Sequence, residues 1–122
     1  MPGPGAAPDR VQGFLGGMAP TITVNQILAA MVAVSTGRVR VVRCVATSVG
    51  AAGSTVIDMR RNGVSMYRTA AQRPTLVGTA SGQFSAFAPD EQAFQPGDVL
   101  SLIVATSAGH GGVIATAALE EP

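Results

Sequence analysis

The sequence has 122 residues, enough for one domain with a single hydrophobic core. Only 12% of the residues are charged, about half the usual fraction in globular proteins, so the surface favours burial against partners over full solvation. A formal net charge of +1 lacks the basic excess of a nucleic-acid-binding protein, and we expect no nucleic-acid partner. Cys44 is the only cysteine, which excludes an intrachain disulfide and a multi-cysteine metal site.

Residues 1–20 hold four of the eight prolines and five of the fifteen glycines. Because proline lacks a backbone donor and glycine resists ordering, we expect neither a helix nor a ladder strand here. We predict an extended N-terminal arm over 1–20, held by a neighbouring subunit, and a β-sandwich domain over 21–122. Four apolar residues are spaced as anchors for a partner: Val11, Phe14, Leu15 and Met18.

No basic region precedes an apolar core near Met1, so we expect no signal peptide and synthesis in the bacterial cytoplasm. The longest apolar run, 27–34, is too short to cross a bilayer, and we expect no membrane partner.

Thr21 to Val24 alternates as a strand. Residues 25–33 fit either a strand, which we favour, or a short helix, because their apolar residues also match helical spacing. Arg38 to Thr47 predicts a long strand rich in β-branched residues. Its alternation changes phase at Val41-Val42, and a bulge there would keep all its arginines outward. We expect a solvated or intersubunit face formed by Arg38, Arg40, Arg43, Arg60 and Tyr67.

Ser54 to Thr69 predicts a β-hairpin that turns at Asn62-Gly63, because a type I′ turn needs positive φ at both positions. With a two-residue loop, Met59 lies opposite Met66 and Asp58 lies opposite Tyr67. The inner face would then hold Ile57, Met59, Val64 and Met66, and the outer face Asp58, Arg60, Ser65 and Tyr67. A three-residue loop with Gly63 in a bulge stays open, since the shorter loop puts Arg68 opposite Ile57 on the apolar face.

Pro74 to Val77 predicts a bend or an edge strand, and Phe84 to Phe87 a short strand. Phe94 is expected to anchor in the core, and a turn is expected at Pro96, Gly97 and Asp98, with Asp98 bonded to its own backbone. Val99 to Thr106 predicts a central strand, and 113–119 closes the sheet. Seven or eight short strands with regular turns indicate an all-β, antiparallel sandwich of jelly-roll type. The alternative fold is a sandwich with one helix near residues 25–33.

No residue constellation indicates catalysis, so we expect a non-enzyme without cofactor or metal. His110, the sole histidine, lies in a glycine turn and is expected to be an exposed turn residue rather than a ligand or base. A site shared by His110 from several subunits on a symmetry axis stays open. Asp90-Glu91 lacks the alternating oxygen ligands of a calcium loop, and no glycine run has phosphate-loop form.

The run from Val39 to Leu119 resembles a type of small jelly-roll domain found among structural proteins of tailed phages and phage-derived gene transfer agents. The matching stretches are Gly53–Ser54, Val56–Gly63, Arg73–Leu76, Phe94–Leu100 and the closing strand. The resemblance implies a head decoration, head-spike or fibre component of a virion or phage-like particle. It implies a homo-oligomer (trimer or pentamer) bound to capsid or fibre subunits, and it carries no catalytic residues.

Two hypotheses follow. The first is a structural subunit, a head decoration or vertex spike attached through its N-terminal arm. The alternative is a carbohydrate-binding module that adheres to a cell-surface polysaccharide through the loops 78–83, 89–95 and 108–112.

Overall fold

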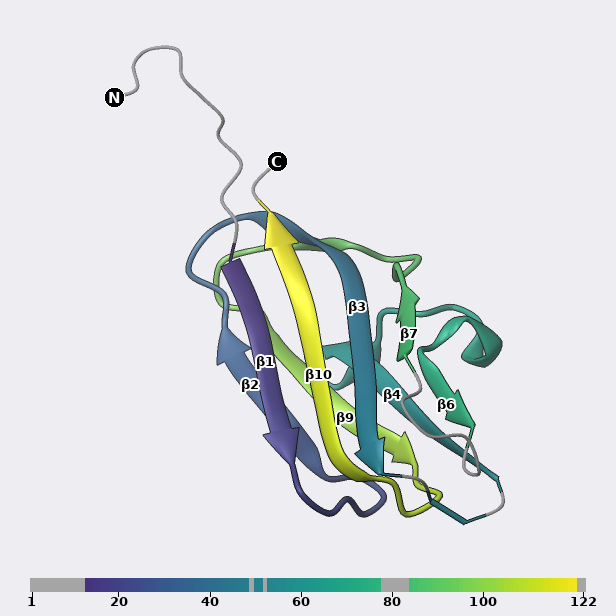
Figure 1. Cartoon of the computed structure of the whole chain (residues 1–122). Coiled ribbons are helices and arrows are strands. Elements are labelled where there is room, and N and C mark those ends of the chain that lie inside the picture. Colours follow the sequence, from purple (N-terminus) through teal and green to yellow (C-terminus); the bar gives the residue numbers. More distant parts are fainter. Residues whose placement is uncertain (1–12, 49, 52, 78–83, 121–122) are drawn as a thin grey trace, which may run out of the picture.

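The computed structural model describes residues 13–48, 50–51, 53–77 and 84–120, which form two antiparallel β-sheets facing each other (Figure 1). This part of the chain contains ten strands and no α-helix. The strands are β1 (Gly13–Ala19), β2 (Ile27–Val32), β3 (Gly37–Ser48), β4 (Ser54–Arg61), β5 (Val64–Ser65), β6 (Thr75–Val77), β7 (Phe84–Phe87), β8 (Ala93–Phe94), β9 (Val99–Thr106) and β10 (Gly111–Glu120), with a 3₁₀ turn at Ala70–Gln72. The predicted all-β sandwich is confirmed.

The first sheet has the strand order β1-β10-β3-β7, with β8 also paired to β3. The second sheet has the order β2-β9-β4-β5, with β6 also paired to β4. The strands β1 to β4 alternate between the sheets as the chain proceeds, so each connection crosses from one layer to the other. This alternation lets both inner faces contribute to one core.

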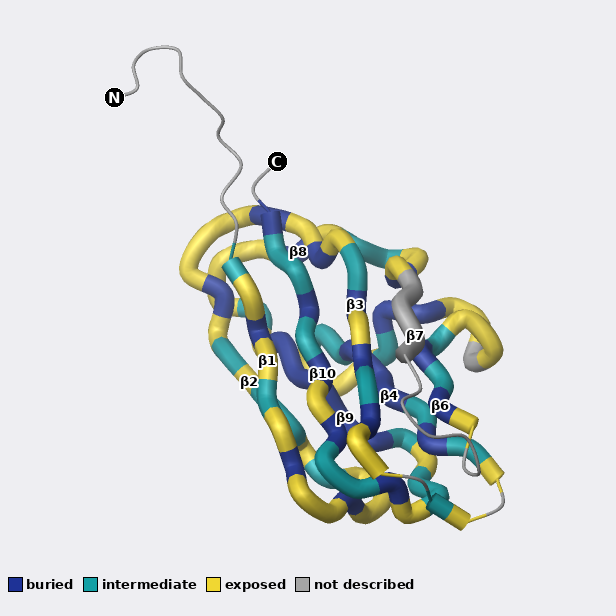
Figure 2. Tube along the Cα trace, viewed as in Figure 1, coloured by how far each residue is buried: buried dark blue, intermediate teal, exposed yellow. Residues whose placement is uncertain are grey.

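The core lies between the two sheets, where the dark tube of Figure 2 marks the buried positions. Five consecutive residues of β9, Leu100–Val104, are buried, because β9 lies between β2 and β4. The predicted central position of this strand is therefore confirmed. Phe94 is buried, as expected of a core anchor, and β6 is a short strand beside β4.

The hairpin turns through two residues, as predicted. Asn62 and Gly63 have φ angles of 53° and 82°, and Arg61 pairs with Val64. The Met66 amide donates to the Met59 carbonyl at 2.8 Å, which confirms their pairing. The alternative prediction of a three-residue loop is therefore wrong.

Arg68 does not reach the apolar face, because the chain leaves the sheet soon after Ser65. Ile57 donates its amide to the Pro74 carbonyl instead, at 3.0 Å. The two-residue loop therefore does not place Arg68 opposite Ile57, which was the reason for considering a longer loop.

The predicted grouping of Asp58, Arg60 and Ser65 on one face agrees with the contacts between their side chains, but the predicted exposure is wrong in part. Asp58 and Tyr67, expected on an outer face, are buried, and Val64, expected inside, is exposed. The side chains of Arg60, Ser65 and Arg73 contact the Asp58 carboxylate and shield it from solvent. Val64 stays exposed because it belongs to a two-residue strand at the hairpin tip.

Residues 13–19 were predicted to lack a ladder strand, and this is wrong, because they form β1 alongside β10. The glycines that argued against order have a packing role: a Cβ on Gly17 would overlap the Leu28 carbonyl oxygen, where the edges of the two sheets touch. The arm predicted over 1–20 thus ends no later than Gln12. Residues 1–12, including the predicted anchor Val11, lie outside the described residues.

The segment before β2 also differs from expectation. Thr21 to Val24 forms no strand, because the chain turns at Asn25 (φ 71°), whose amide donates to the Val104 carbonyl at 2.7 Å. Residues 27–32 then form the strand β2, and the helical alternative is wrong.

Candidate functional site: an arginine-lined hollow on the first sheet

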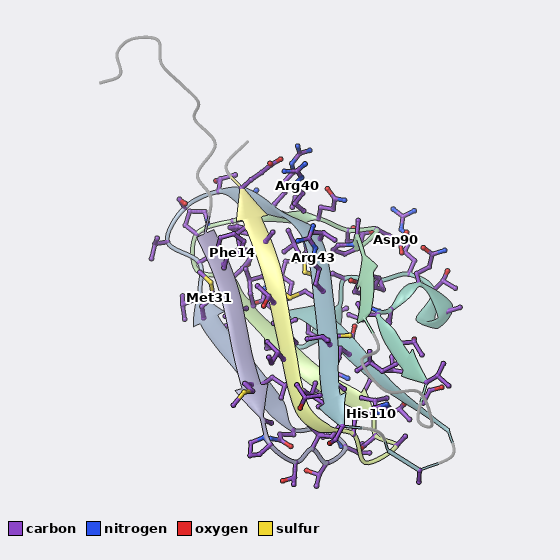
Figure 3. The ribbon with its side chains drawn as sticks, viewed as in Figure 1. Phe14, Met31, Arg40, Arg43, Asp90 and His110 are labelled. Atoms are coloured by element: carbon purple, nitrogen blue, oxygen red, sulfur yellow. The ribbon has the colours of Figure 1, made fainter. Side chains whose placement is uncertain are left out.

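The outer face of the first sheet contains a hollow of about 490 Å³. The register of the sheet places Phe14 of β1 beside Ala118 of β10, and Thr116 of β10 beside Arg43 of β3. The hollow is lined by Gly13, Phe14, Arg40, Val41, Arg43, Ala88, Thr116, Ala118, Leu119 and Glu120. Small side chains on β10 form its floor, and Phe14 and the arginines stand on opposite sides of that strand (Figure 3).

A β-bulge brings the arginines to this face. Ala118 of β10 pairs with Val41 of β3, and Leu119 pairs with Val39. The register therefore shifts at Arg40, one or two residues before the predicted Val41-Val42 position. Arg38, Arg40 and Arg43 are all exposed as a result. The prediction that a bulge keeps the three arginines outward is therefore confirmed.

The charges of the hollow are unevenly paired. Glu120, which is nearly buried, accepts a hydrogen bond from Arg38 Nε to its Oε1 at 2.6 Å. Arg40 Nη1 lies 3.9 Å from Glu120 Oε2, the distance of a loose ion pair. All carboxylates between residues 13 and 120 are described, and none of them forms an ion pair with Arg43. The guanidinium group of Arg43 therefore has no ion-pair partner among the described residues.

The other predicted interface residues lie elsewhere. Arg60 sits on β4 of the second sheet, where its Nε donates to Asp58 Oδ2 at 2.9 Å. Tyr67 is only 3% exposed, and burial, followed by the charge of Asp58, raises the pKa of its hydroxyl. The structure therefore brings Arg38, Arg40 and Arg43 together but separates Arg60 and Tyr67 from them.

The described anchors divide between two faces, because successive side chains of a strand alternate. Phe14 and Met18 are 70% and 64% exposed on the outer face, and Leu15 is buried in the core. Phe14 contributes directly to the hollow. Leu15 is thus a core residue rather than an exposed anchor.

The predicted turn residues join two loops that are distant in sequence. Asp98 Oδ2 accepts from the Gln95 amide at 2.8 Å, as expected, and its Oδ1 accepts from Asn62 Nδ2 at 3.0 Å. These two donors, the Gln95 amide first, lower the pKa of Asp98. Asn62 Oδ1 accepts in turn from the Val99 amide at 2.9 Å. The hairpin turn and the 95–98 turn therefore support each other.

His110 is buried, so its predicted exposure is wrong. Its Nε2 lies 3.0 Å from the Val77 carbonyl oxygen, which can only accept, so Nε2 carries the proton. Nδ1 therefore accepts from the Thr55 hydroxyl, whose Oγ1 lies 2.6 Å away and itself accepts from the Ala108 amide at 3.0 Å. His110 thus joins β4, β6 and the β9–β10 connection, and no simple sequence pattern reveals that role.

The described residues contain no cluster of three or more histidine, cysteine or acidic side chains that could hold a metal ion. Cys44 is buried, and burial raises the pKa of its thiol to about 12. Asp90 and Glu91 both contact Arg68: the Arg68 amide donates to Asp90 Oδ2 at 2.8 Å, and its Nε lies 2.9 Å from Glu91 Oε2.

Large apolar side chains are exposed on both sheets, and the sequence identified only Phe14 and Met18 among them. On the first sheet these are Phe14, Met18 and Ile114, and on the second Ile27, Val32 and Val99. Val34, just after β2, is 88% exposed. Figure 2 shows the exposed positions alternating along β1 and β2.

No protein-family model matches this sequence, and no curated protein matches it either. Within the described residues, no helix is long and apolar enough to span a membrane.

Proposed function

We propose that this chain is a structural subunit of a phage-like particle, a head decoration or vertex spike that functions as a homo-oligomer. The observation that carries the proposal is the exposure of large apolar side chains on the outer faces of both sheets. Apolar surface of this extent on a chain with 12% charged residues favours permanent association.

The strand order supports a jelly-roll type of sandwich. In that topology the first, eighth, third and sixth strands form one sheet, and the second, seventh, fourth and fifth form the other. If β5 and β6 count as one strand, and β7 and β8 as another, the two observed orders follow this arrangement. The type of sandwich agrees with the resemblance to phage structural proteins.

The position at which β1 begins supports attachment through the N-terminal segment. Gly13, where β1 begins, pairs with Leu119 near the end of β10. The segment preceding β1 and the end of the chain are thus joined to the same end of the sandwich. Attachment at this end would leave the opposite end, around 108–112, directed away from the particle.

The direct test is to isolate phage-like particles from producing cells and detect the chain on them by immunoelectron microscopy. We expect labelling of the particles, and loss of labelling when residues 1–12 are deleted. The shortened chain should still fold, because the deleted residues precede β1. Particles without the full-length chain would overturn the proposal.

The polysaccharide-adhesion alternative gains no support from the loops expected to form its site. Residue 111 pairs with Ser48 at one end of β3, whereas Ala93 pairs with Arg38 at the other. The 108–112 and 89–95 loops therefore lie at opposite ends of the sandwich, and the 78–83 loop lies outside the described residues.

A further inference from the structure

We infer that the hollow on the first sheet is the docking site for a second copy of this chain, whose Asp90 carboxylate pairs with Arg43. The inference rests on the homo-oligomer of the proposed function and names the residues that join its subunits. The contributing segment of the second copy is the acidic loop, defined as residues 89–92, which follows Ala88 at the rim of the hollow.

The ion pairs among the described residues leave out Arg43, Arg61 and Asp90, and Arg61 instead donates to the Ala93 carbonyl. Asp58, Glu91 and Glu120 each form ion pairs with arginines of the same chain. Both carboxylate oxygens of Asp98 accept hydrogen bonds within the coupled turns.

Asp90 is the exposed carboxylate that has no ion pair among the described residues. Its Oδ2 accepts only from a backbone amide, that of Arg68, and its Oδ1 takes no hydrogen bond from a described residue. Arg43 is the arginine of the first sheet that likewise has no ion pair with a described residue. A second copy therefore supplies the opposite charges that the described residues of one subunit do not provide.

The positions of the two charges favour contact between copies. Arg43 lies in the middle of β3, and Asp90 lies in the loop that follows β7 at the edge of the same sheet (Figure 3). They form no ion pair within the subunit. One copy can thus present the edge that carries Asp90 to the hollow of the next. Such a contact between unlike surfaces can repeat around a closed ring.

The surroundings of the hollow supply affinity, and the charges supply orientation. Phe14, Met18 and Ile114 are exposed on the same outer face, where docking would remove their apolar surface from water. A guanidinium group binds a carboxylate with two parallel hydrogen bonds, which fixes the mutual angle of the partners. Since charges are scarce on this chain, one specific ion pair can select the register of an otherwise apolar interface.

The test is charge reversal in the full-length chain, with self-association measured by sedimentation velocity over a concentration series. We expect Arg43→Glu and Asp90→Arg each to weaken self-association at least tenfold. The double variant should restore it to within about threefold of the original chain. A 1:1 mixture of the two single variants should also associate, because each supplies the charge that the other lacks.

Thr106→Glu is the control, because it adds a negative charge at an exposed position of β9 in the second sheet, away from the hollow and the acidic loop. It should leave the association constant unchanged, and circular dichroism should show that every variant is folded. If one single variant does not fold, the association constant of the other single variant is compared with that of the control, and this comparison still tests the inference.

The failures are distinguishable. If the unaltered chain self-associates but the single variants match the control, or the double variant and the mixture show no rescue, the inference is overturned and the proposed function stands. If Arg43→Glu abolishes binding to a soluble polysaccharide but not self-association, the hollow has another occupant. A chain that stays monomeric at every concentration overturns both the inference and the homo-oligomer.

Discussion

Replacing Asp58 by asparagine tests whether the buried carboxylate stabilises the hairpin. Asp58 has no exposed surface, and three side chains contact it. Arg60 Nε lies 2.9 Å from Oδ2, Ser65 Oγ donates to Oδ1 at 2.7 Å, and Arg73 Nε lies 3.4 Å from Oδ1. Asparagine keeps the shape but leaves two guanidinium groups without their counter-charge.

Removing one partner of a buried ion pair destabilises a protein by about 3–5 kcal/mol. The side chains of Arg60 and Arg73 are 29% and 24% exposed, so water can hydrate them in part after the substitution. We therefore expect the lower end of that range, about 3 kcal/mol. With a urea m-value of about 1.5 kcal/mol/M, the unfolding midpoint falls by about 2 M.

The assay is urea unfolding followed by circular dichroism at a fixed chain concentration, because association also contributes to apparent stability. Gln72→Ala is the control, since Gln72 is exposed in the 3₁₀ turn, away from the proposed contact between copies; it should stay within about 0.5 kcal/mol of the original chain. A loss below about 1 kcal/mol for Asp58→Asn would show that the arginines do not depend on this carboxylate.

Further predictions concern the sheet edge, the core thiol and the coupled turns. Gly17→Ala should destabilise the chain by about 1–3 kcal/mol in the same assay, because the added Cβ overlaps the Leu28 carbonyl; an unchanged midpoint would mean that the edges separate freely. Cys44, with a pKa of about 12, should resist a thiol reagent at pH 8 until urea unfolds the chain, and rapid labelling of the folded chain would contradict its burial. The folded pKa of Asp98 is lowered, so its stabilising effect is present above the unfolded pKa, near 3.8, and is lost as the pH falls through the folded value. Asn62→Ala removes one donor and should raise the Asp98 pKa in an NMR titration; an unmoved pKa would contradict the coupling of the turns.

The elements predictable from the sequence are those in which local chemistry and burial agree. Asn62-Gly63 determines the hairpin turn because few other residue pairs adopt positive φ twice at low cost. The apolar run of β9 matches a strand with neighbours on both sides. Phase changes in alternation were also informative, since the change in β3 predicted a bulge and the outward arginines.

The errors arise where tertiary contacts reverse a local preference. The glycines of β1 suggest disorder when considered alone, but Gly17 allows the two sheet edges to touch. Asp58 and His110 are polar residues that look exposed in the sequence, and both are buried because distant partners satisfy them. The hollow was not predictable, because it depends on the register of three strands from distant parts of the chain.

The proposed homo-oligomer requires the outer faces of this sandwich to be covered in the working protein. Hydrogen–deuterium exchange of the full-length chain, compared at low and high concentration, tests it most directly. We predict added protection at high concentration in β1 and in the acidic loop, the two sides of the proposed contact. Exchange that is independent of concentration across the whole chain, together with the sedimentation of a single subunit, would contradict the account.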